Sequence, residues 1–294
     1  MESSISISNE FSERENSSKE GIVDFYNEAT EDYLFWSKDL NMHFGYFKWF
    51  STNPWKRDSM LNEMNDQVYR RLGLKDKAQV VADLGCGMGG TMRHFLKKNP
   101  KLFMFGVTLS DFQVSEGNTL LKDHNGIICN EDYSATTLTN ETMDGVIAIE
   151  SLCHSGHNYQ SLAEGYRILK LGGKFVITDA FLKKDPSELS SGSNYCYQQL
   201  CKGWSLDGLG TISKVREDLY KIGFSKVEVE DVSNRIAPSV LHVPFAIPGF
   251  ILKTILKNKP VKKQSWNNLK ASFFALLSGF QRRSFGYYII TASK

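Results

Sequence analysis

The 294-residue sequence lacks the features that mark a secreted, disulfide-bonded or zinc-binding protein. Its five cysteines are odd in number and include no C-x-x-C pair, so neither a disulfide framework nor a cysteine metal site is indicated. Residues 1–20 are polar and contain no apolar segment of the kind found in signal peptides or membrane anchors. We therefore expect residues 1–20 to be a disordered tail and the protein to be cytoplasmic.

The sequence also has little net charge and no long hydrophobic run. A formal net charge of +2, without a Lys/Arg stripe interleaved with aromatic residues, argues against nucleic acid as a partner. Residues 243–256 are apolar, but they include Pro244, Pro248 and Lys253 and fall short of the ~18 residues of a membrane span. We expect this segment to be a lid or pocket wall, with peripheral contact to a membrane surface as a further option.

Short β-branched runs alternate with helical patterns between residues 79 and 180, which is typical of an α/β fold with a mostly parallel, Rossmann-like sheet. The predicted strands are residues 79–84, 102–109, 126–129, 143–150 and 173–179, and the predicted helices between them are 91–98, 111–124 and 158–169. Around this core, 75–182, we expect an N-terminal helical cap at 21–74. We expect a helical lid insertion and the completion of the sheet at 183–294, with a lid at 185–202, helices at 212–222 and 267–282 and strands at 225–232 and 285–292.

The first predicted strand runs into a glycine-rich segment, Asp83-Leu84-Gly85-Cys86-Gly87-Met88-Gly89-Gly90-Thr91, which opens a helix. Its glycines allow a sharp turn and a close approach to a ligand. Asp83, two residues before the first glycine, indicates a ligand with a cationic amino group, such as the methionine end of S-adenosylmethionine. A glycine turn capped by Asp83 is the structural alternative. The second strand ends at Thr108 rather than at a ribose-binding acid, which argues against a nicotinamide-dependent dehydrogenase.

Several motifs resemble those of one enzyme family. The glycine-rich segment resembles motif I of class I S-adenosylmethionine-dependent methyltransferases, and residues 166–175 resemble the glycine turn before that family's fifth strand. The segment 106–113, Gly-Val-Thr-Leu-Ser-Asp-Phe-Gln, is similar to the branch of tocopherol, sterol and cyclopropane-fatty-acid enzymes. Residues 41–47 resemble the Met-His-His-Gly-Phe-Tyr element of tocopherol methyltransferases. The resemblance covers residues 24–294 and implies the class I methyltransferase fold.

This resemblance implies S-adenosylmethionine as the cofactor and a set of residues that hold it. The set is Asp83, Gly85, Cys86, Gly87, Thr108, Leu109, Gln113, Asp132, Tyr133 and Glu150. Asp132 is expected to accept a hydrogen bond from the adenine amino group, although the neighbouring Glu131 leaves the register open. The structural alternatives are a solvated turn at Asp132 and an exposed helical position for Gln113.

The segment 148–157 resembles the Ile-Glu-x-x-x-His segment of sterol methyltransferases, which makes Glu150 the first catalytic candidate. A carboxylate beside the transferred methyl group stabilises a developing carbocation or removes a proton afterwards. A cap at the strand end is the alternative for Glu150. His154, as a base or contact residue, and Tyr46 are further catalytic candidates, whereas His157 is expected to start the next helix. No third ligand accompanies the two histidines, so no metal site is expected.

Aromatic residues before the core suggest a hydrophobic pocket for the acceptor. The predicted substrate-binding residues are Tyr26, Tyr33, Trp36, Phe44 and Phe47, with ordinary core packing as the alternative. Aromatic faces also stabilise positive charge, which suits methylation of an alkene. We therefore expect C-methylation of an isoprenoid-like, lipophilic small molecule. The alternatives are O- or N-methylation of a natural product or phospholipid head group, and a non-catalytic scaffold; self-association into a homo-oligomer is left open.

Overall fold

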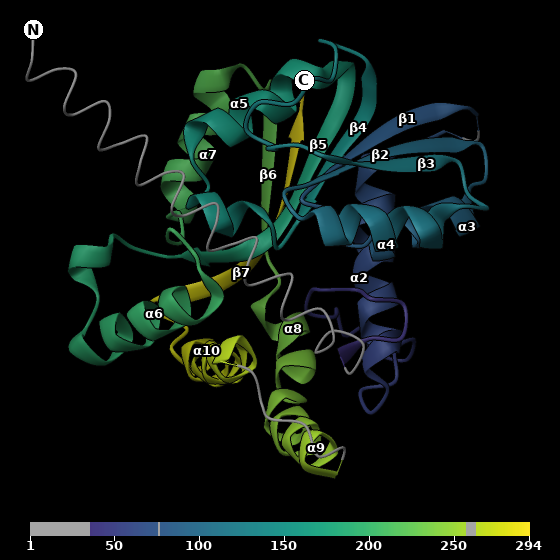
Figure 1. Ribbon diagram of the computed structural model, residues 1–294. Helices are drawn as coiled ribbons and strands as arrows, with labels where there is room; N and C mark the ends of the chain where they lie inside the picture. Colours follow the sequence, from purple (N-terminus) through teal and green to yellow (C-terminus); the bar gives the residue numbers. More distant parts are fainter. Residues whose placement is uncertain (1–35, 76, 257–262) are drawn as a thin grey trace, which may run out of the picture.

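The computed structural model describes residues 36–75, 77–256 and 263–294. The expected tail, 1–20, and two of the predicted substrate-binding residues, Tyr26 and Tyr33, lie outside the described residues. The described part contains a seven-stranded sheet in the order β3-β2-β1-β4-β5-β7-β6 (Figure 1). Its strands are β1 (Gln79–Leu84), β2 (Leu102–Thr108), β3 (Gly126–Asn130), β4 (Met143–Ile149), β5 (Leu169–Leu182), β6 (Lys226–Asp231) and β7 (Phe285–Ser293).

The first five strands pair in parallel, and β7 runs antiparallel to both β5 and β6. The prediction of a mostly parallel, Rossmann-like sheet is therefore confirmed. Central strands such as β1 read as continuous apolar runs because both faces of the sheet are covered by helices. Within β1, the neighbours Val81 and Ala82 belong to two different hydrophobic clusters, one on each face, and both are fully buried.

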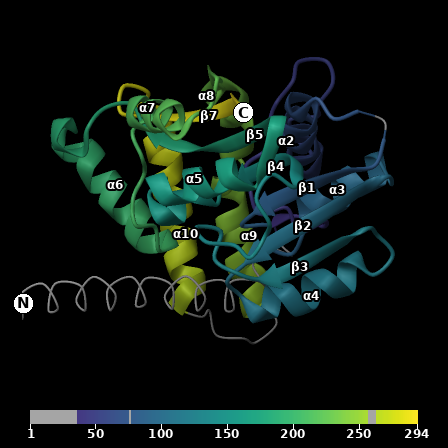
Figure 2. The same cartoon turned by 90° about the horizontal axis from the view of Figure 1, so that it is seen from above.

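Helices cover the two faces of the sheet through the apolar sides of their sequences. One cluster joins the sheet to α2 (Arg57–Leu72), α3 (Gly90–Lys98) and α4 (Asp111–Leu121), as the residues Val68, Phe95 and Leu121 show. The other cluster joins it to α5 (Tyr159–Ile168) and α7 (Ile212–Ile222), for example through Leu162 and Leu219. Figure 2 shows this layered arrangement from above. The sheet is thus held rigidly, and the loops after its parallel strands are fixed in place.

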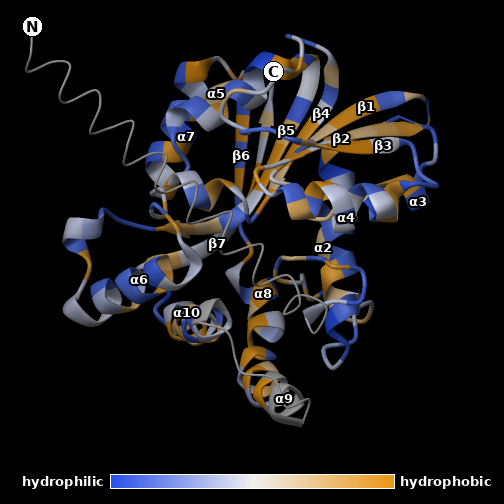
Figure 3. Cartoon of the chain, viewed as in Figure 1, coloured by the Kyte–Doolittle hydropathy of each residue, from blue (hydrophilic) through white to orange (hydrophobic). Residues whose placement is uncertain are grey.

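The remaining helices gather mainly beside the sheet (Figure 1). They are α6 (Ser191–Trp204), α8 (Ser233–Val240), α9 (Val243–Leu256) and α10 (Lys263–Phe280), with the short 3-10 helices η1 (Leu152–Ser155) and η2 (Pro186–Glu188) in connecting segments. The predicted lid at 185–202 is therefore mainly α6, and the apolar segment 243–256 is the helix α9. Figure 3 shows hydrophobic residues along the central strands and again along α8 and α9.

Helices α6 and α10 approach each other closely at Gly203. A Cβ atom at this position would lie 2.6 Å from the Cβ atom of Ala271, closer than side-chain carbons approach in proteins. The glycine therefore sets the distance between α6 and α10. Across the described residues, no helix combines the length and the hydropathy needed to cross a bilayer.

Candidate active site

The glycine-rich segment after β1 forms a tight loop against the residue that follows Glu150. The backbone N–H groups of Gly85 and Cys86 both donate to the carbonyl oxygen of Val107, at 3.0 Å each. Gly85 has a φ of 85°, and a Cβ atom there would lie 2.4 Å from the Cβ atom of Ser151. Only glycine fits this left-handed and crowded position. The loop is consequently held open beside the carboxyl edge of the sheet, where α/β folds place their ligands.

A small cavity of about 80 Å³ lies over this loop. Nine of the ten residues expected to hold the cofactor line it, although they come from four separate strand ends. They are Asp83, Gly85, Cys86, Gly87, Thr108, Leu109, Gln113, Tyr133 and Glu150. The segment from Leu40 to His43 forms the opposite wall. The structure thus brings these residues together around one space.

Asp83 is almost fully buried beneath this cavity, and burial raises the pKa of its carboxyl group to about 7. A buried carboxylate without a nearby cation is destabilised, because it has lost its hydration. A ligand with a positively charged amino group would restore the favourable charge balance. The alternative of a simple cap at Asp83 does not explain why the carboxyl group borders a cavity.

Thr108 and Gln113 form a hydrogen-bonded pair at the end of β2. The hydroxyl group of Thr108 donates to Oε1 of Gln113 at 2.6 Å, and the backbone N–H of Gln113 donates to Oγ of Ser110 at 3.2 Å. Gln113 is only 1% exposed, so the alternative of an exposed helical position is wrong. The side chain is fixed at the wall of the small cavity, where its amide can meet a polar ligand.

Asp132 is the one predicted cofactor residue that does not border the small cavity. It lies after β3 and is half-buried. Its Oδ1 accepts hydrogen bonds from the backbone N–H of Ser134 at 2.8 Å and from its hydroxyl group at 2.7 Å. The carboxylate therefore shapes a local turn, and its contact with the adenine group stays a prediction.

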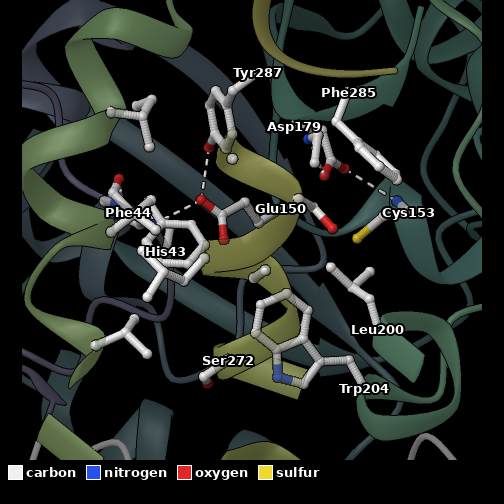
Figure 4. A pocket seen from close by; sticks show the side chains of 18 of the residues that line it. His43, Phe44, Glu150, Cys153, Asp179, Leu200, Trp204, Ser272, Phe285 and Tyr287 are labelled. Atoms are coloured by element: carbon white, nitrogen blue, oxygen red, sulfur yellow. Dashed lines mark hydrogen bonds between the residues drawn. The ribbon is translucent and has the colours of Figure 1, made fainter. Parts of the chain in front are cut away.

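A second cavity of about 550 Å³ lies between the sheet edge and the helices α6, α8, α9 and α10 (Figure 4). Most of its lining is apolar or aromatic, including Trp204, Leu209, Ile236, Val243, Ile247, Leu276 and Phe285. Two predicted substrate-binding residues, Trp36 and Phe44, line it, and their rings meet edge to face with centroids 6.0 Å apart. This volume is typical of a pocket for a small organic molecule.

The two cavities share four lining residues: Met42, His43, Glu150 and His154. A group bound in the small cavity and a group bound in the large one would therefore meet at these side chains. This shared wall is the geometric centre of the candidate active site. Polar side chains in this wall would contact both ligands, and they could take part in the transfer of a group from one ligand to the other.

Glu150 is the best-defined residue of the shared wall (Figure 4). Its Oε1 accepts a hydrogen bond of 2.6 Å from the Tyr287 hydroxyl group and one of 2.7 Å from the backbone N–H of Phe44. Burial raises the pKa of the Glu150 carboxyl to about 8 despite these two donors, which act in the opposite direction. The residue also has a φ of 49°, a left-handed conformation that a non-glycine residue seldom adopts. Such local strain at a strand end is a common mark of functional sites.

The two histidines of the shared wall are buried and held neutral. Burial lowers the pKa of His43 to about 4, and its Nε2 lies 3.1 Å from Oδ1 of Asn65. Burial also lowers the pKa of His154, whose Nδ1 lies 3.4 Å from the carbonyl oxygen of Ser205. A neutral histidine can accept a proton or orient a ligand, so the structure keeps His154 as a candidate.

Tyr46 and Phe47 border neither cavity, so their predicted roles at the site are corrected. After Gly45 the chain turns away along the start of α2, where the Tyr46 N–H donates to the carbonyl of Met60 at 2.8 Å. Tyr46 is buried in the core, and the Phe47 ring packs on Trp49 with centroids 5.0 Å apart. The core-packing alternative therefore holds for Tyr46, whereas Phe47 is half-buried against the exposed Trp49.

His157 does not start a helix as expected; it supports the cavity wall from behind. Its Nδ1 accepts a hydrogen bond from the backbone N–H of Gly210 at 3.1 Å, and its Nε2 lies 3.1 Å from Oδ2 of Asp179. Asp179 in turn accepts from the backbone N–H of Cys153 at 3.0 Å and lines the large cavity. The sequence analysis did not single out Asp179 or Tyr287, which lie in strands far along the chain from Glu150.

The family model and several of the sequence relatives that match this chain are described as methyltransferases or as enzymes dependent on S-adenosyl-L-methionine. The family model described as "Methyltransferase domain" matches residues 82–177. The chain is 24% identical over 220 residues to 24-methylenesterol C-methyltransferase 2 of Arabidopsis thaliana, an alignment that covers 71% of this chain and 57% of that protein. The chain spans 57% to 61% of the length of three of the sterol C-methyltransferases that it matches.

Solved structures agree with this result at the level of the fold. A cyclopropane synthase of Mycobacterium tuberculosis superposes with a TM-score of 0.80 at 15% identity, covering 94% of this chain and 98% of that one. A geranyl diphosphate C-methyltransferase of Streptomyces coelicolor A3(2), solved with S-adenosyl-L-homocysteine, superposes with a TM-score of 0.71 at 16% identity, covering 94% and 97%. The fold and the site therefore define a class I methyltransferase domain. Sterol C-methyltransferases are among the relatives that match this chain in sequence, and cyclopropane synthases are among the structures that share its fold.

Proposed function

We propose that this protein transfers the methyl group of S-adenosylmethionine to a carbon atom of an isoprenoid-like, lipophilic small molecule. The observation that carries the proposal is the wall of four residues shared by a small cavity over the glycine loop and a large apolar cavity. The names of the sterol and geranyl diphosphate C-methyltransferases point to the same kind of reaction in relatives. The acceptor itself is inferred from the lining of the large cavity.

The residues of the small cavity fit the methionine end of the cofactor. Asp83 offers a carboxyl group for the ammonium, and the N-terminus of α3 and the glycine loop allow a close approach. When bound, the cofactor supplies an electrophilic methyl group. The cavity of about 80 Å³ is well below the ~300 Å³ of common ligand pockets, so the segment from Leu40 to His43 must shift when the cofactor binds.

The large cavity suits an apolar alkene more than a charged acceptor. In the described residues its lining includes one basic side chain, Arg282, whose guanidinium donates to the amide oxygen of Asn234. The aromatic rings of Trp36, Phe44 and Trp204 exclude water and tolerate a cation at their faces. Transfer of a methyl group from a sulfonium ion is a direct displacement, so alignment of the two ligands supplies most of the catalysis.

Glu150 is the residue that we assign to the charge that develops on the acceptor. As the new carbon–carbon bond forms, an alkene becomes a carbocation next to the methylated carbon. The Glu150 carboxylate, held by Tyr287 and Phe44, faces both cavities and can stabilise this cation. It can then take a proton from the adjacent carbon, so that a neutral alkene leaves. Neutral His154 is a second proton acceptor in reach of the same space.

The test is incubation of the purified protein with methyl-labelled cofactor and a panel of sterols, prenyl alcohols and prenylquinols, followed by mass and NMR analysis of the products. The proposal predicts label on a carbon of at least one isoprenoid acceptor. Label on oxygen or nitrogen of the same compounds, or of phosphoethanolamine, would replace C-methylation by the O- or N-methyltransferase alternative. Binding of S-adenosylhomocysteine by calorimetry separates a wrong acceptor from a wrong cofactor.

A further inference from the structure

An exposed aromatic loop projects from the chain just before α2. The turn is closed by three hydrogen bonds between Lys48 and Thr52. The Lys48 N–H donates to Oγ1 of Thr52 at 2.7 Å, and the Thr52 N–H and hydroxyl group donate to the Lys48 carbonyl at 3.0 Å and 2.9 Å. Trp49 and Phe50 form its tip, and Phe50 is fully exposed. Phe50 also has a φ of 63°, a conformation that is disfavoured for a bulky side chain. Backbone strain and solvent exposure are both unfavourable for an aromatic residue. Their combination at Phe50 indicates that this tip has a function other than stabilising the fold.

The loop is fastened to the helices that enclose the large cavity. Nε2 of His242, between α8 and α9, lies 2.6 Å from the carbonyl oxygen of Pro54, and the Phe47 N–H donates to the carbonyl of Arg235 at 2.8 Å. These contacts bring two distant segments with exposed apolar side chains together. We call this set the aromatic face; it consists of Trp49, Phe50, Trp55, Leu241 and Phe245. In Figure 1 its helices lie at the end of the molecule opposite the C-terminus.

The exposure of the aromatic face is unusual for a water-facing surface. Trp55 is 86% exposed and Phe245 is 78% exposed, and neither has a packing role that explains the residue type. Large apolar patches on a protein surface mark contacts with other molecules or with membranes. Tryptophan is the aromatic residue most typical of the region between lipid head groups and acyl chains.

Charge around the aromatic face has one sign. The exposed residues Lys48 and Lys56 flank Trp49, Phe50 and Trp55, and the sequence has no acidic residue between Asp39 and Asp58. Between Ser233 and Gly249, which covers α8 and the start of α9, the sequence has Arg235 and no Asp or Glu. This bias complements an anionic surface.

Helix α9 links the aromatic face to the large cavity. Val243, Ala246 and Ile247 line that cavity, whereas Phe245 of the same turn faces solvent. The helix is therefore apolar on more than one side, which a purely structural helix in water does not require. A surface that covered Phe245 would lie next to the wall of the cavity.

We propose that the aromatic face inserts into the interfacial layer of an anionic lipid bilayer, with the surrounding Lys and Arg residues on the lipid head groups. Amphipathic surfaces of this kind combine apolar burial with electrostatic attraction to acidic lipids. The bound protein would hold the α9 wall of the large cavity against the membrane, so that a lipophilic molecule reaches the cavity without crossing water. This docking does not depend on which acceptor is methylated.

The test is co-sedimentation of the full-length protein with vesicles of phosphatidylcholine alone or mixed equally with phosphatidylglycerol, at low and high salt. The protein is expected to bind the mixed vesicles, and to release them in 0.5 M NaCl because salt screens the head-group attraction; this salt level is about three times physiological. The variants Phe50→Asp and Phe245→Asp should each raise the lipid concentration for half-binding roughly ten-fold. Both side chains are exposed, so neither substitution disturbs the core.

Leu171→Asp is the matched control, because Leu171 is 79% exposed and lies beside the C-terminal Lys294, whose carbonyl accepts from the Gly172 N–H at 2.9 Å. It should bind vesicles like the unchanged protein. Equal loss in this control, equal binding to neutral vesicles, or no binding at all would each overturn the proposal. So would a lipid-free dimer that Phe50→Asp converts to a monomer, because the face would then bind a second copy. None of these readouts requires turnover, so they are independent of the proposed reaction.

Discussion

The Tyr287 hydroxyl group donates to the Glu150 carboxylate across 2.6 Å and so joins the antiparallel strand β7 to the end of the parallel strand β4. Tyr287 is buried and Glu150 is half-buried, and desolvation is the main reason why the pKa of Glu150 rises to about 8 and why the pKa of Tyr287 lies well above its usual value. A carboxyl group in this setting is largely protonated at neutral pH in the absence of a nearby cation. It gains its charge most readily when a positive ligand arrives.

Glu150→Gln should reduce turnover by about 10²- to 10⁴-fold while leaving the affinity for S-adenosylhomocysteine within a few-fold. The amide oxygen can still accept from Tyr287 and Phe44, so the backbone geometry is kept, but the side chain cannot become negative. Turnover is followed with methyl-labelled cofactor and binding by calorimetry. Glu116→Gln, at an exposed position of α4, is the control and should be neutral. Unchanged turnover in Glu150→Gln would remove this residue from the mechanism.

Tyr287→Phe should shift the pH dependence of turnover to higher pH. The Tyr287 hydroxyl group lowers the pKa of Glu150 by donating to it, so its loss raises that pKa further above 8. If the active form is the carboxylate, activity rises with pH, and the variant needs a more alkaline solution to reach the same ionised fraction. The measurement is kcat/KM from pH 6 to 10 for both proteins. A shift toward acid, or a uniform loss without a shift, would contradict this role for Tyr287.

Asp83→Asn should stabilise the ligand-free protein at pH 8 and weaken cofactor binding. The pKa of Asp83 is about 7 in the folded state and 3.8 by model value, so the folded protein binds the proton more tightly. The stabilisation from the protonated carboxyl is full below pH 3.8 and is lost as pH rises from there to 7. Asparagine avoids that loss, which we expect to add about 2 to 4 kcal/mol to the free energy of unfolding at pH 8.

The same variant should lose roughly 10- to 100-fold in affinity for S-adenosylhomocysteine, because the charge-assisted contact with the ammonium is gone. Denaturant unfolding at pH 4, 6 and 8, together with calorimetric titration, measures both effects. The difference in stability between variant and parent should shrink toward pH 4. A constant difference across this range would show that the Asp83 carboxyl is not the titrating group.

Gly203→Ala and Gly192→Ala test how closely α6 must approach α10. Both glycines are in α6, but a Cβ atom at Gly203 would lie 2.6 Å from Ala271, whereas one at Gly192 meets nothing within 4 Å. We expect Gly203→Ala to destabilise the protein by about 1 to 3 kcal/mol through overpacking. Gly192→Ala should be neutral or stabilise it by about 0.5 to 1 kcal/mol. Thermal unfolding distinguishes the two, and equal effects would exclude a tight contact at Gly203.

The sequence predicted most of the residues that line the small cavity because the determinants of this cavity are local. Asp83 and the glycines that follow it lie within a few residues of one another, and a strand-to-helix turn fixes their arrangement. Thr108 and Gln113 follow the next strand at a spacing that places both at the same edge of the sheet. These residues follow one another along the chain in the same order as the strand ends around the cavity. The sequence pattern and the family resemblance were therefore enough to predict that they lie together.

The lining of the large cavity was harder to predict because its contacts join distant segments. Tyr287 reaches Glu150 only because β7 inserts antiparallel between β5 and β6. This strand pairing cannot be predicted from the local sequence around Tyr287. The aromatic residues from Phe44 to Phe47 were predicted as a group to line the site, but the structure separates them. Phe44 faces the cavity, but Tyr46 and Phe47 leave it once the chain turns along α2 at Gly45. Composition indicates that aromatic residues are present, but the backbone direction decides where they point.

The wall common to the two cavities also has a thermodynamic consequence. Met42, His43, Glu150 and His154 cannot adapt to one ligand without changing the space offered to the other. The two binding equilibria are therefore linked, and the factor by which the cofactor alters affinity for the acceptor must equal the factor in the reverse direction. If the movement of residues 40–43 that makes room for the cofactor is part of that link, the protein favours an ordered sequence in which the first ligand to bind shapes the site of the second.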